Sequence, residues 1–167
     1  GYSDITAFLT SITQKTDLVT FHGPMLTTYK ESWIEYNYGL MQRVLFGEKF
    51  IKLFSPNDLE PKILKDGKAI GPLWGGNMCL LTNRLGSAEK LDTNGSILFL
   101  EDIDEYLYSF ERMLVQMRNA RMFDNIKGLI FGELKDMKDQ EIKFGRNTDE
   151  IILDICGDLN IPIISNF

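Results

Sequence analysis

The sequence predicts an α/β fold in two parts. In the second part, apolar runs of strand length alternate with amphipathic helical stretches, which indicates a largely parallel sheet. A polar stretch with two prolines, residues 55–61, carries no periodicity and separates the two parts. We therefore predict one domain over residues 1–55, a linker over 56–66 and a second domain over 67–167.

Both ends of the sequence are predicted to lie within the folded part of a longer protein. A strand should precede the helix that begins near Ser3, yet only two residues do so. Residues 161–165 form a continuous apolar strand pattern and the sequence stops two residues later, whereas natural termini are usually polar, loosely held tails. We therefore expect the chain to be a piece of a larger protein.

The first part is predicted to contain two helices and two short strands. A helix begins near Ser3 and turns Ile5, Phe8, Leu9 and Ile12 to one face, which we expect to be buried. The other elements expected, in order, are a strand at 18–21, a Gly-Pro turn at 22–25, a helix at 31–46 and an edge strand at 49–54.

The second part carries the stronger α/β pattern. Residues 96–100 form a continuous apolar run, which is typical of a strand buried on both faces. A helix over about residues 107–121 follows, with Asp102 or Asp104 as its cap. The other elements expected are a strand at 70–74, a tight turn at 75–77 that opens a helix to about residue 85, a strand at 128–132, a charged loop at 136–146, a helix at 148–159 and a strand at 161–165.

Composition narrows the class of protein. The hydrophobic fraction of 44% is enough for a folded core, and the net charge of −6 comes without a basic stripe, so nucleic acid is not an expected partner. No apolar run reaches the roughly 18 residues of a membrane span, so we expect no membrane partner.

Cys79 and Cys156 lie in apolar helical patterns and are expected to be buried free thiols, which favours a reducing compartment. His22 is the only histidine, so no histidine pair is available for a metal, and we expect neither metal nor cofactor.

Ser3 is the first candidate for a catalytic residue. A serine at the start of a helix lies beside unpaired backbone N–H groups and at the positive end of the helix dipole, where an oxyanion is stabilised. The alternative interpretation is an ordinary N-cap. The local sequence also lacks the second glycine of the Gly-x-Ser-x-Gly nucleophile turn.

Three further features could carry chemistry. Glu101 follows the most apolar strand, at the edge of the sheet where catalytic groups of α/β folds gather, although it could equally belong to an acidic helix cap. The segment Trp74-Gly75-Gly76-Asn77 could bring backbone N–H groups close to a ligand, or could serve packing alone. His22 could be a general base for Ser3 or a turn residue bonded to backbone.

Five short segments, in order and with sensible gaps, resemble the LD-carboxypeptidase family. They are Gly-Tyr-Ser-Asp-Ile-Thr-Ala at 1–7, Thr-Phe-His-Gly-Pro-Met at 20–25, Gly-Pro-Leu-Trp-Gly-Gly-Asn at 71–77, Ile-Leu-Phe-Leu-Glu-Asp-Ile at 97–103 and Arg-Met-Leu-Val-Gln-Met at 112–117. The family consists of serine peptidases that remove the terminal D-residue from murein tetrapeptides, and it includes the microcin C self-immunity peptidases. The resemblance covers essentially the whole chain.

The resemblance implies roles for individual residues. Ser3 would be the nucleophile of a Ser-Glu-His triad, Glu101 its acidic member, and the backbone N–H of Asp4 half of the oxyanion hole. The family's histidine lies in a Phe-Gly-His motif that would begin at Phe167, so we expect residues 1–167 alone to be inactive. Trp74, Gly76 and Asn77 are predicted to contact substrate.

The resemblance also implies a two-domain architecture, and it leaves two alternative functions open. Residues 1–55 would be the C-terminal half of an α/β nucleophile domain and residues 67–167 a smaller α/β domain, both incomplete, with the active site between them. A homodimer in the cytoplasm is expected, acting on murein peptide. The alternatives are hydrolysis of microcin C or a related peptidyl-nucleotide, and a non-catalytic relative that binds peptides or cell-wall fragments.

Overall fold

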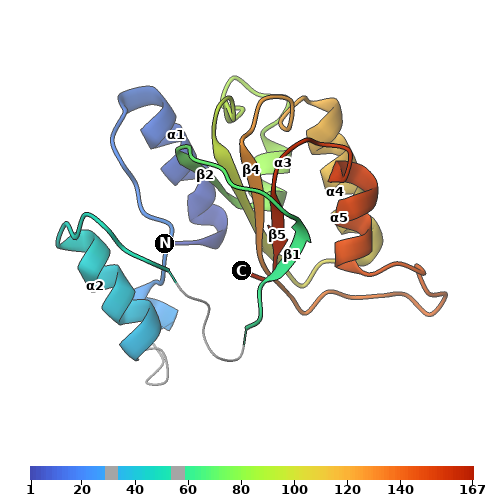
Figure 1. The fold of residues 1–167 in the computed structure, drawn as a ribbon, viewed down its shortest axis with the longest axis horizontal. Helices are drawn as coiled ribbons and strands as arrows, with labels where there is room; N and C mark the ends of the chain where they lie inside the picture. The colour runs from blue at the N-terminus through green and yellow to red at the C-terminus, as the bar shows by residue number, and fades with distance from the viewer. Residues whose placement is uncertain (29–33, 54–58) are drawn as a thin grey trace.

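The second part of the chain folds around one five-stranded sheet (Figure 1). The computed structural model describes residues 1–28, 34–53 and 59–167. The strand order is β1-β5-β4-β3-β2, and β2 to β5 run parallel while β1 pairs antiparallel with β5. The strands are β1 (Lys62–Lys65), β2 (Leu73–Asn77), β3 (Ile97–Ile103), β4 (Gly128–Lys135) and β5 (Ile163–Ser165). The α/β fold with a largely parallel sheet is therefore confirmed.

Three helices connect the strands and enclose the core. They are α3 (Met78–Asn83), α4 (Leu107–Asn119) and α5 (Thr148–Cys156), and α4 packs against both α3 and α5. The core is formed by alternate residues of the inner strands and by the apolar stripes of the helices, including Leu98, Leu100, Phe110, Leu114, Phe131, Ile151 and Ile152. On the other face of β3, Ile97 and Phe99 are half-buried, so this strand is fully covered on one face only.

Two predicted helix starts have different outcomes. Asn147 caps α5 in a capping box with Glu150, so the helix begins at Thr148 as predicted, although it ends at Cys156 rather than at residue 159. The cap predicted for α4 is wrong, because Tyr106 occupies that position without a side-chain cap and Asp102 lies inside β3. The charged segment 136–146 contains no helix or strand, apart from an isolated bridge between Lys138 and Tyr106. The predicted loop is therefore confirmed.

Close backbone approach explains why β2 extends through a predicted turn. The strand covers residues 73–77 rather than 70–74, and its two glycines have φ of 136° and 138°, which residues with a side chain rarely adopt. A Cβ on Gly75 would lie 1.8 Å from the carbonyl oxygen of Phe99 on β3, and a Cβ on Gly76 would lie 2.7 Å from the Thr6 side chain. Glycine is therefore required for packing at both positions, and the predicted tight turn is wrong.

The segment predicted as a linker contains a strand. Residues 62–65 form β1, which pairs with residues 163–165 of β5 at one edge of the sheet. Residues 56–58 lie outside the described part of the chain. The division of the chain into two domains stays a prediction.

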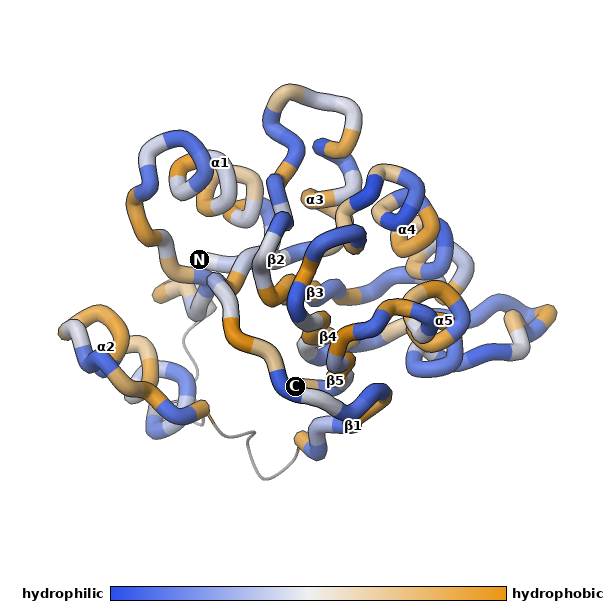
Figure 2. The backbone as a smooth tube through the Cα atoms, turned by 45° about the horizontal axis from the view of Figure 1, so that its top comes forward, coloured by the Kyte–Doolittle hydropathy of each residue, from blue (hydrophilic) through white to orange (hydrophobic). Residues whose placement is uncertain are grey.

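The N-terminal part is helical and packs differently from the sheet. A short 3-10 turn (Ser3–Ile5) leads into α1 (Thr6–Thr16), and after a second turn (Leu26–Thr28) a π-helical turn (Ile34–Tyr38) continues into α2 (Gly39–Leu45). The strands predicted at 18–21 and 49–54 are absent from their described residues, and residue 54 lies outside the description, as do residues 31–33 of the predicted helix. Figure 2 shows α2 lying apart from the sheet, with hydrophobic segments along it.

The face of α1 that is buried is not the predicted one. Thr6 and Thr10 are buried, whereas Ile5, Phe8 and Ile12 are exposed and Leu9 is half-buried. The reason is that α1 packs against β2 and α3 through polar contacts with its threonine side.

Across the described residues, we find no helix with the length and apolar character that a bilayer crossing requires.

Candidate active site

Ser3 has a backbone conformation that is uncommon for a residue other than glycine. Its φ is 57°, in the left-handed region, and it follows the extended Tyr2 and opens the 3-10 turn that leads into α1. Neither this turn nor α1 has a side-chain cap hydrogen bond, so the N-cap interpretation of Ser3 finds no support. A strained serine between an extended segment and a helix is typical of nucleophile turns, because the turn exposes the hydroxyl.

The first turn of α1 is joined to the edge of the sheet by a buried hydrogen bond. The backbone N–H of Asn77 donates to Oγ1 of Thr6 at 3.1 Å. Gly76 allows this approach, because any larger residue would collide with Thr6. The helix that begins at Ser3 is thereby held against the C-terminal end of β2.

Arg84, at the C-terminal end of α3, binds the same helix from a second direction. Its guanidinium donates to the carbonyl oxygen of Ala7 at 2.9 Å, to Oγ1 of Thr10 at 2.8 Å and to Oγ of Ser11 at 2.5 Å. The planar guanidinium suits such a fork of acceptors, and its side chain is 12% exposed. The sequence analysis did not single out Arg84, because its partners lie more than 70 residues away.

Glu101 lies on β3, directly opposite Asn77 in the parallel register. Its Oε1 is shielded from solvent and has no hydrogen-bond partner within the described residues, and Nε2 of His22 lies 4.0 Å away. Burial raises the pKa of the Glu101 carboxyl, the neighbouring Asp102 raises it further, and a hydrogen bond from the Asn77 side chain partly offsets both effects. A carboxylate with one uncommitted oxygen can accept a hydrogen bond from an imidazole.

Asp102 organises this end of the sheet from the opposite side of β3. Its buried carboxylate accepts hydrogen bonds from Nδ2 of Asn77 at 3.1 Å and from the backbone N–H of Cys79 at 3.0 Å. Burial raises the pKa of Asp102, and its hydrogen bonds act in the opposite direction. The sequence indicated Asp102 only as a possible helix cap, yet it fixes the start of α3 and the Asn77 side chain.

The residues predicted to contact substrate lie near Glu101 but are largely committed to packing. Asn77 is buried, and its Oδ1 accepts the N–H of Leu80 while its Nδ2 donates to Asp102. Gly76 packs on Thr6, and Trp74 is half-buried against the hydrophobic core. Substrate contact by these three residues therefore stays a prediction, as does the oxyanion-hole role of Asp4.

The two cysteines differ, contrary to the prediction that both are buried. Cys156 is buried in α5, and burial raises its pKa to about 12. Cys79 is exposed at the start of α3, where partial burial and then the neighbouring carboxylates, first Asp102, raise its pKa. Cys79 is exposed because it lies on the outer side of the short helix α3, whose inward residues are Met78, Leu81 and Thr82.

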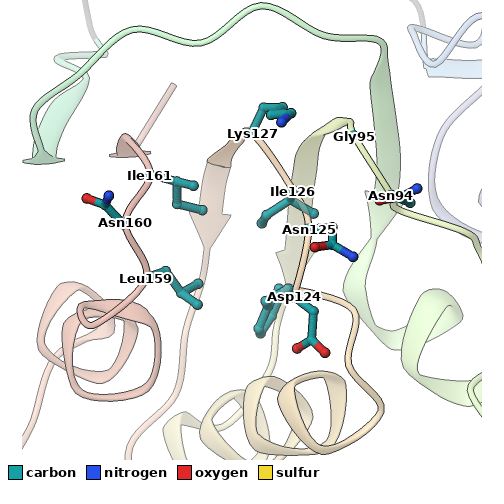
Figure 3. Close-up of a pocket in the computed structure, with 10 residues that line it drawn as sticks. Asn94, Gly95, Asp124, Asn125, Ile126, Lys127, Leu159, Asn160 and Ile161 are labelled. Atoms are coloured by element: carbon teal, nitrogen blue, oxygen red, sulfur yellow. The ribbon is translucent and has the colours of Figure 1, made fainter.

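A separate hollow of about 450 Å³ lies at the opposite end of the strands (Figure 3). It is lined by loop residues that precede β3, β4 and β5, among them Asn94, Asn125, Lys127 and Asn160. Ligands of open α/β sheets bind beyond the carboxyl ends of the strands, which is where Glu101 and Asn77 lie. The hollow is therefore not part of the candidate site.

The largely parallel five-stranded sheet and the helices that connect its strands place this chain among the α/β proteins. The family model for the LD-carboxypeptidase C-terminal domain matches residues 70–167. The chain therefore belongs to the LD-carboxypeptidase family.

Three similar proteins illustrate this relationship. The probable murein peptide carboxypeptidase of Bacillus subtilis (strain 168) is 34% identical over 171 residues, which cover 100% of this chain and 52% of that protein. The microcin C7 self-immunity protein MccF of Escherichia coli is 30% identical over 100% of this chain and 56% of its own length. The crystal structure of muramoyltetrapeptide carboxypeptidase from Oxalobacter formigenes superposes with a TM-score of 0.79 at 27% identity, covering 99% of this chain and 56% of that one. The chain thus spans about half the length of the curated relatives it matches.

Proposed function

We propose that this chain supplies the nucleophile and the acid of a serine LD-carboxypeptidase that releases terminal D-alanine from murein tetrapeptide. It would act within a polypeptide of its relatives' length. Ser3 is the nucleophile, Glu101 the acidic member of the triad, and the backbone N–H of Asp4 one donor of the oxyanion hole. The triad histidine comes from outside residues 1–167, and no metal or cofactor takes part.

The observation that carries the proposal is the connection between Ser3 and Glu101. Thr6, three residues after Ser3, is hydrogen-bonded to Asn77, and Asn77 is the register partner of Glu101. The strained Ser3 backbone and the uncommitted Oε1 of Glu101 support the same roles. The names of the relatives support a carboxypeptidase acting on murein peptide.

The chemistry follows from these positions. The triad histidine takes the proton of Ser3 as its Oγ attacks the carbonyl carbon of the L,D-peptide bond, and the oxyanion hole holds the tetrahedral intermediate. The histidine then protonates the leaving amine, D-alanine departs, and water hydrolyses the acyl-enzyme. Glu101 keeps the imidazole oriented and stabilises its charged form.

The direct test measures D-alanine release by a polypeptide of the relatives' length that contains residues 1–167. Ser3→Ala is expected to lower kcat by about 10⁴–10⁶-fold, as for other triad members. Ser87→Ala, which alters an exposed loop serine, serves as the control and should retain activity. Retention of activity in Ser3→Ala would reject the proposal, and binding of tetrapeptide without hydrolysis by the unaltered polypeptide would favour a non-catalytic binder.

A second substrate follows from the similarity to the self-immunity protein MccF. Cleavage of an aminoacyl-sulfamoyl adenylate, with little release of D-alanine, would favour a peptidyl-nucleotide hydrolase. The 34% identity with the murein peptide carboxypeptidase, against 30% with MccF, favours the murein peptide.

The location and assembly belong to the same proposal. Both cysteines are free, which fits a reducing compartment, and we therefore propose a cytoplasmic protein. A homodimer is proposed from the resemblance to the family. The molar mass measured by light scattering, on a polypeptide of the relatives' length, would distinguish a monomer from a dimer.

A further inference from the structure

His22 lies close to the start of α1 and to β3 at the same time. The N–H of the next residue, Gly23, donates to the carbonyl oxygen of Gly1 at 3.1 Å, so the loop that carries His22 is tied to the residues just before Ser3. On the sheet side, the imidazole contacts the edge of the Phe99 ring, with ring centres 5.7 Å apart and an angle of 68° between the planes. His22 therefore bridges the nucleophile segment and the strand that carries Glu101.

One oxygen of the Glu101 carboxylate, Oε1, lies near the imidazole of His22. This oxygen is shielded from solvent and lacks a hydrogen-bond partner among the described residues. Shielded oxygens of this kind are rare in folded proteins, because leaving one unsatisfied costs free energy. Nε2 of His22 lies 4.0 Å from this oxygen, which is longer than a hydrogen bond but close enough for an electrostatic attraction.

We propose that His22 is a positioning residue, which donates its Nε2–H toward Glu101 and holds this carboxylate ionised and oriented for the triad. The inference rests on the proposed function of Glu101. It assigns to His22 neither the attack on substrate nor the proton transfer from Ser3.

The charges around the pair decide what His22 can contribute. Partial burial lowers the pKa of His22, so the imidazole is neutral at neutral pH. A neutral imidazole offers one N–H donor rather than a charge. On the other side, Asp102 repels a negative Glu101 and the Asn77 amide supports it. On this proposal, loss of the His22 donor should raise the pKa of Glu101 and favour its protonated form, which cannot orient the triad histidine.

A spectroscopic experiment tests the pair without reference to hydrolysis. His22 is the only histidine of the 167-residue chain, so its imidazole carbon-bound protons give one titration curve by NMR. Glu101→Gln removes the negative neighbour and should lower the pKa of His22 by about one unit. The matched control Asp104→Asn removes an exposed carboxylate that pairs with Lys138, and should leave the curve unchanged. An unchanged His22 curve in Glu101→Gln overturns the proposal.

A kinetic experiment in a polypeptide of the relatives' length tests the consequence for catalysis. His22→Leu should lower kcat by about 10–100-fold, the cost typical of losing a partner that orients a catalytic group, and should move the acidic limb of the kcat/KM profile to higher pH. His22→Gln, whose side-chain NH₂ stands near the position of Nε2, should recover most of both effects. Thermal unfolding of the variants confirms that each is folded.

Three results would overturn the positioning role. One is equal losses in His22→Leu and His22→Gln with no change in the pH profile, since these would show a packing role alone. Another is a loss of about 10⁴-fold or more in both variants, since this would make His22 the general base. The third is unchanged kinetics in His22→Leu. Activity that survives Ser3→Ala would reject the proposed function instead, and the NMR titration would still decide whether the pair exists.

Discussion

The sheet and the N-terminal segment differ in how they use apolar side chains. In the sheet and the helices that cover it, residues such as Leu98, Leu114 and Phe131 are completely buried. In the N-terminal segment, Phe8 is 65% exposed and Phe46 is 88% exposed. The sheet is therefore stabilised by its own hydrophobic core, whereas the apolar residues of the N-terminal segment contribute little to the fold of residues 1–167.

The difference shows how the candidate active site is held together. Hydrogen bonds join α1 to the sheet, between Thr6 and Asn77, and to the end of α3, between Arg84 and Ala7, Thr10 and Ser11. Hydrogen bonds are directional, so they fix the position of Ser3 relative to Glu101 more narrowly than an apolar contact would.

The largest effect on stability is expected from a glycine of the sheet. Gly75→Ala places a Cβ 1.8 Å from the carbonyl oxygen of Phe99, and should lower the free energy of unfolding by about 3–5 kcal/mol. Gly23→Ala in the N-terminal segment meets no atom within 4 Å and should change it by less than about 0.5 kcal/mol. Urea denaturation followed by circular dichroism measures both values. Equal effects would mean that the N-terminal loop is packed as tightly as the sheet.

A pair of large-to-small substitutions tests the difference between the two regions directly. Leu114→Ala should cost about 2–5 kcal/mol, because it leaves a cavity in the core. Phe8→Ala removes a larger but mostly exposed side chain and should cost less than about 1 kcal/mol. A cost for Phe8→Ala that matches that of Leu114→Ala in the same denaturation experiment would contradict the comparison.

A smaller effect is expected at the polar contact between the two regions. Arg84→Ala should cost about 1–3 kcal/mol, because three acceptors on α1 lose a charged donor in a largely buried position. The control is Arg43→Ala, which breaks an exposed ion pair with Glu48 and should have no measurable effect. Hydrogen exchange should also show faster opening of α1 in Arg84→Ala than in the unaltered chain. Unchanged exchange in α1 would exclude Arg84 as its anchor.

The smallest effect expected concerns the two thiols. Cys79 should react with a disulfide reagent first but more slowly than a free thiol at pH 8, because its raised pKa reduces the thiolate fraction. The reaction rate of Cys79 should continue to rise with pH in the range where the reaction rate of a free thiol has already reached its plateau. Cys156, with a pKa of about 12, should react only when the core opens, and urea should accelerate it. Two thiols that react together in the folded chain would contradict the burial of α5.

Local patterns predicted the elements whose packing follows from their own sequence. The helical period of α4 and the apolar run of β3 indicated both elements, because their buried residues recur at regular spacing. β1 was missed, since Lys62–Lys65 is a short edge strand whose partner lies about 100 residues later. The glycines of β2 were interpreted as a turn, because their actual constraints come from Phe99 and Thr6, which are distant in the sequence.

In the candidate site, too, local sequence indicated some residues, whereas others depend on contacts that are distant in the sequence. Ser3 could be singled out from its place before a helical pattern and Glu101 from its place after an apolar run, although β3 extends through Glu101 to Ile103. The resemblance to a family gave both residues roles. The supporting residues Arg84 and Asp102 could not be identified in this way, because their functions depend on tertiary contacts. For α1, the apolar pattern even indicated the wrong buried face, since the polar contacts of Thr6 and Thr10 decide its orientation.

The central claim, that Ser3 and Glu101 act as one catalytic unit, is tested most directly by a double-mutant cycle on D-alanine release. We compare Ser3→Ala, Glu101→Gln and the double variant in a polypeptide of the relatives' length. Members of one triad are strongly non-additive, so the double variant should be no slower than the slower single variant. Rate losses that multiply in the double variant would show that the two residues act independently, and would contradict the account.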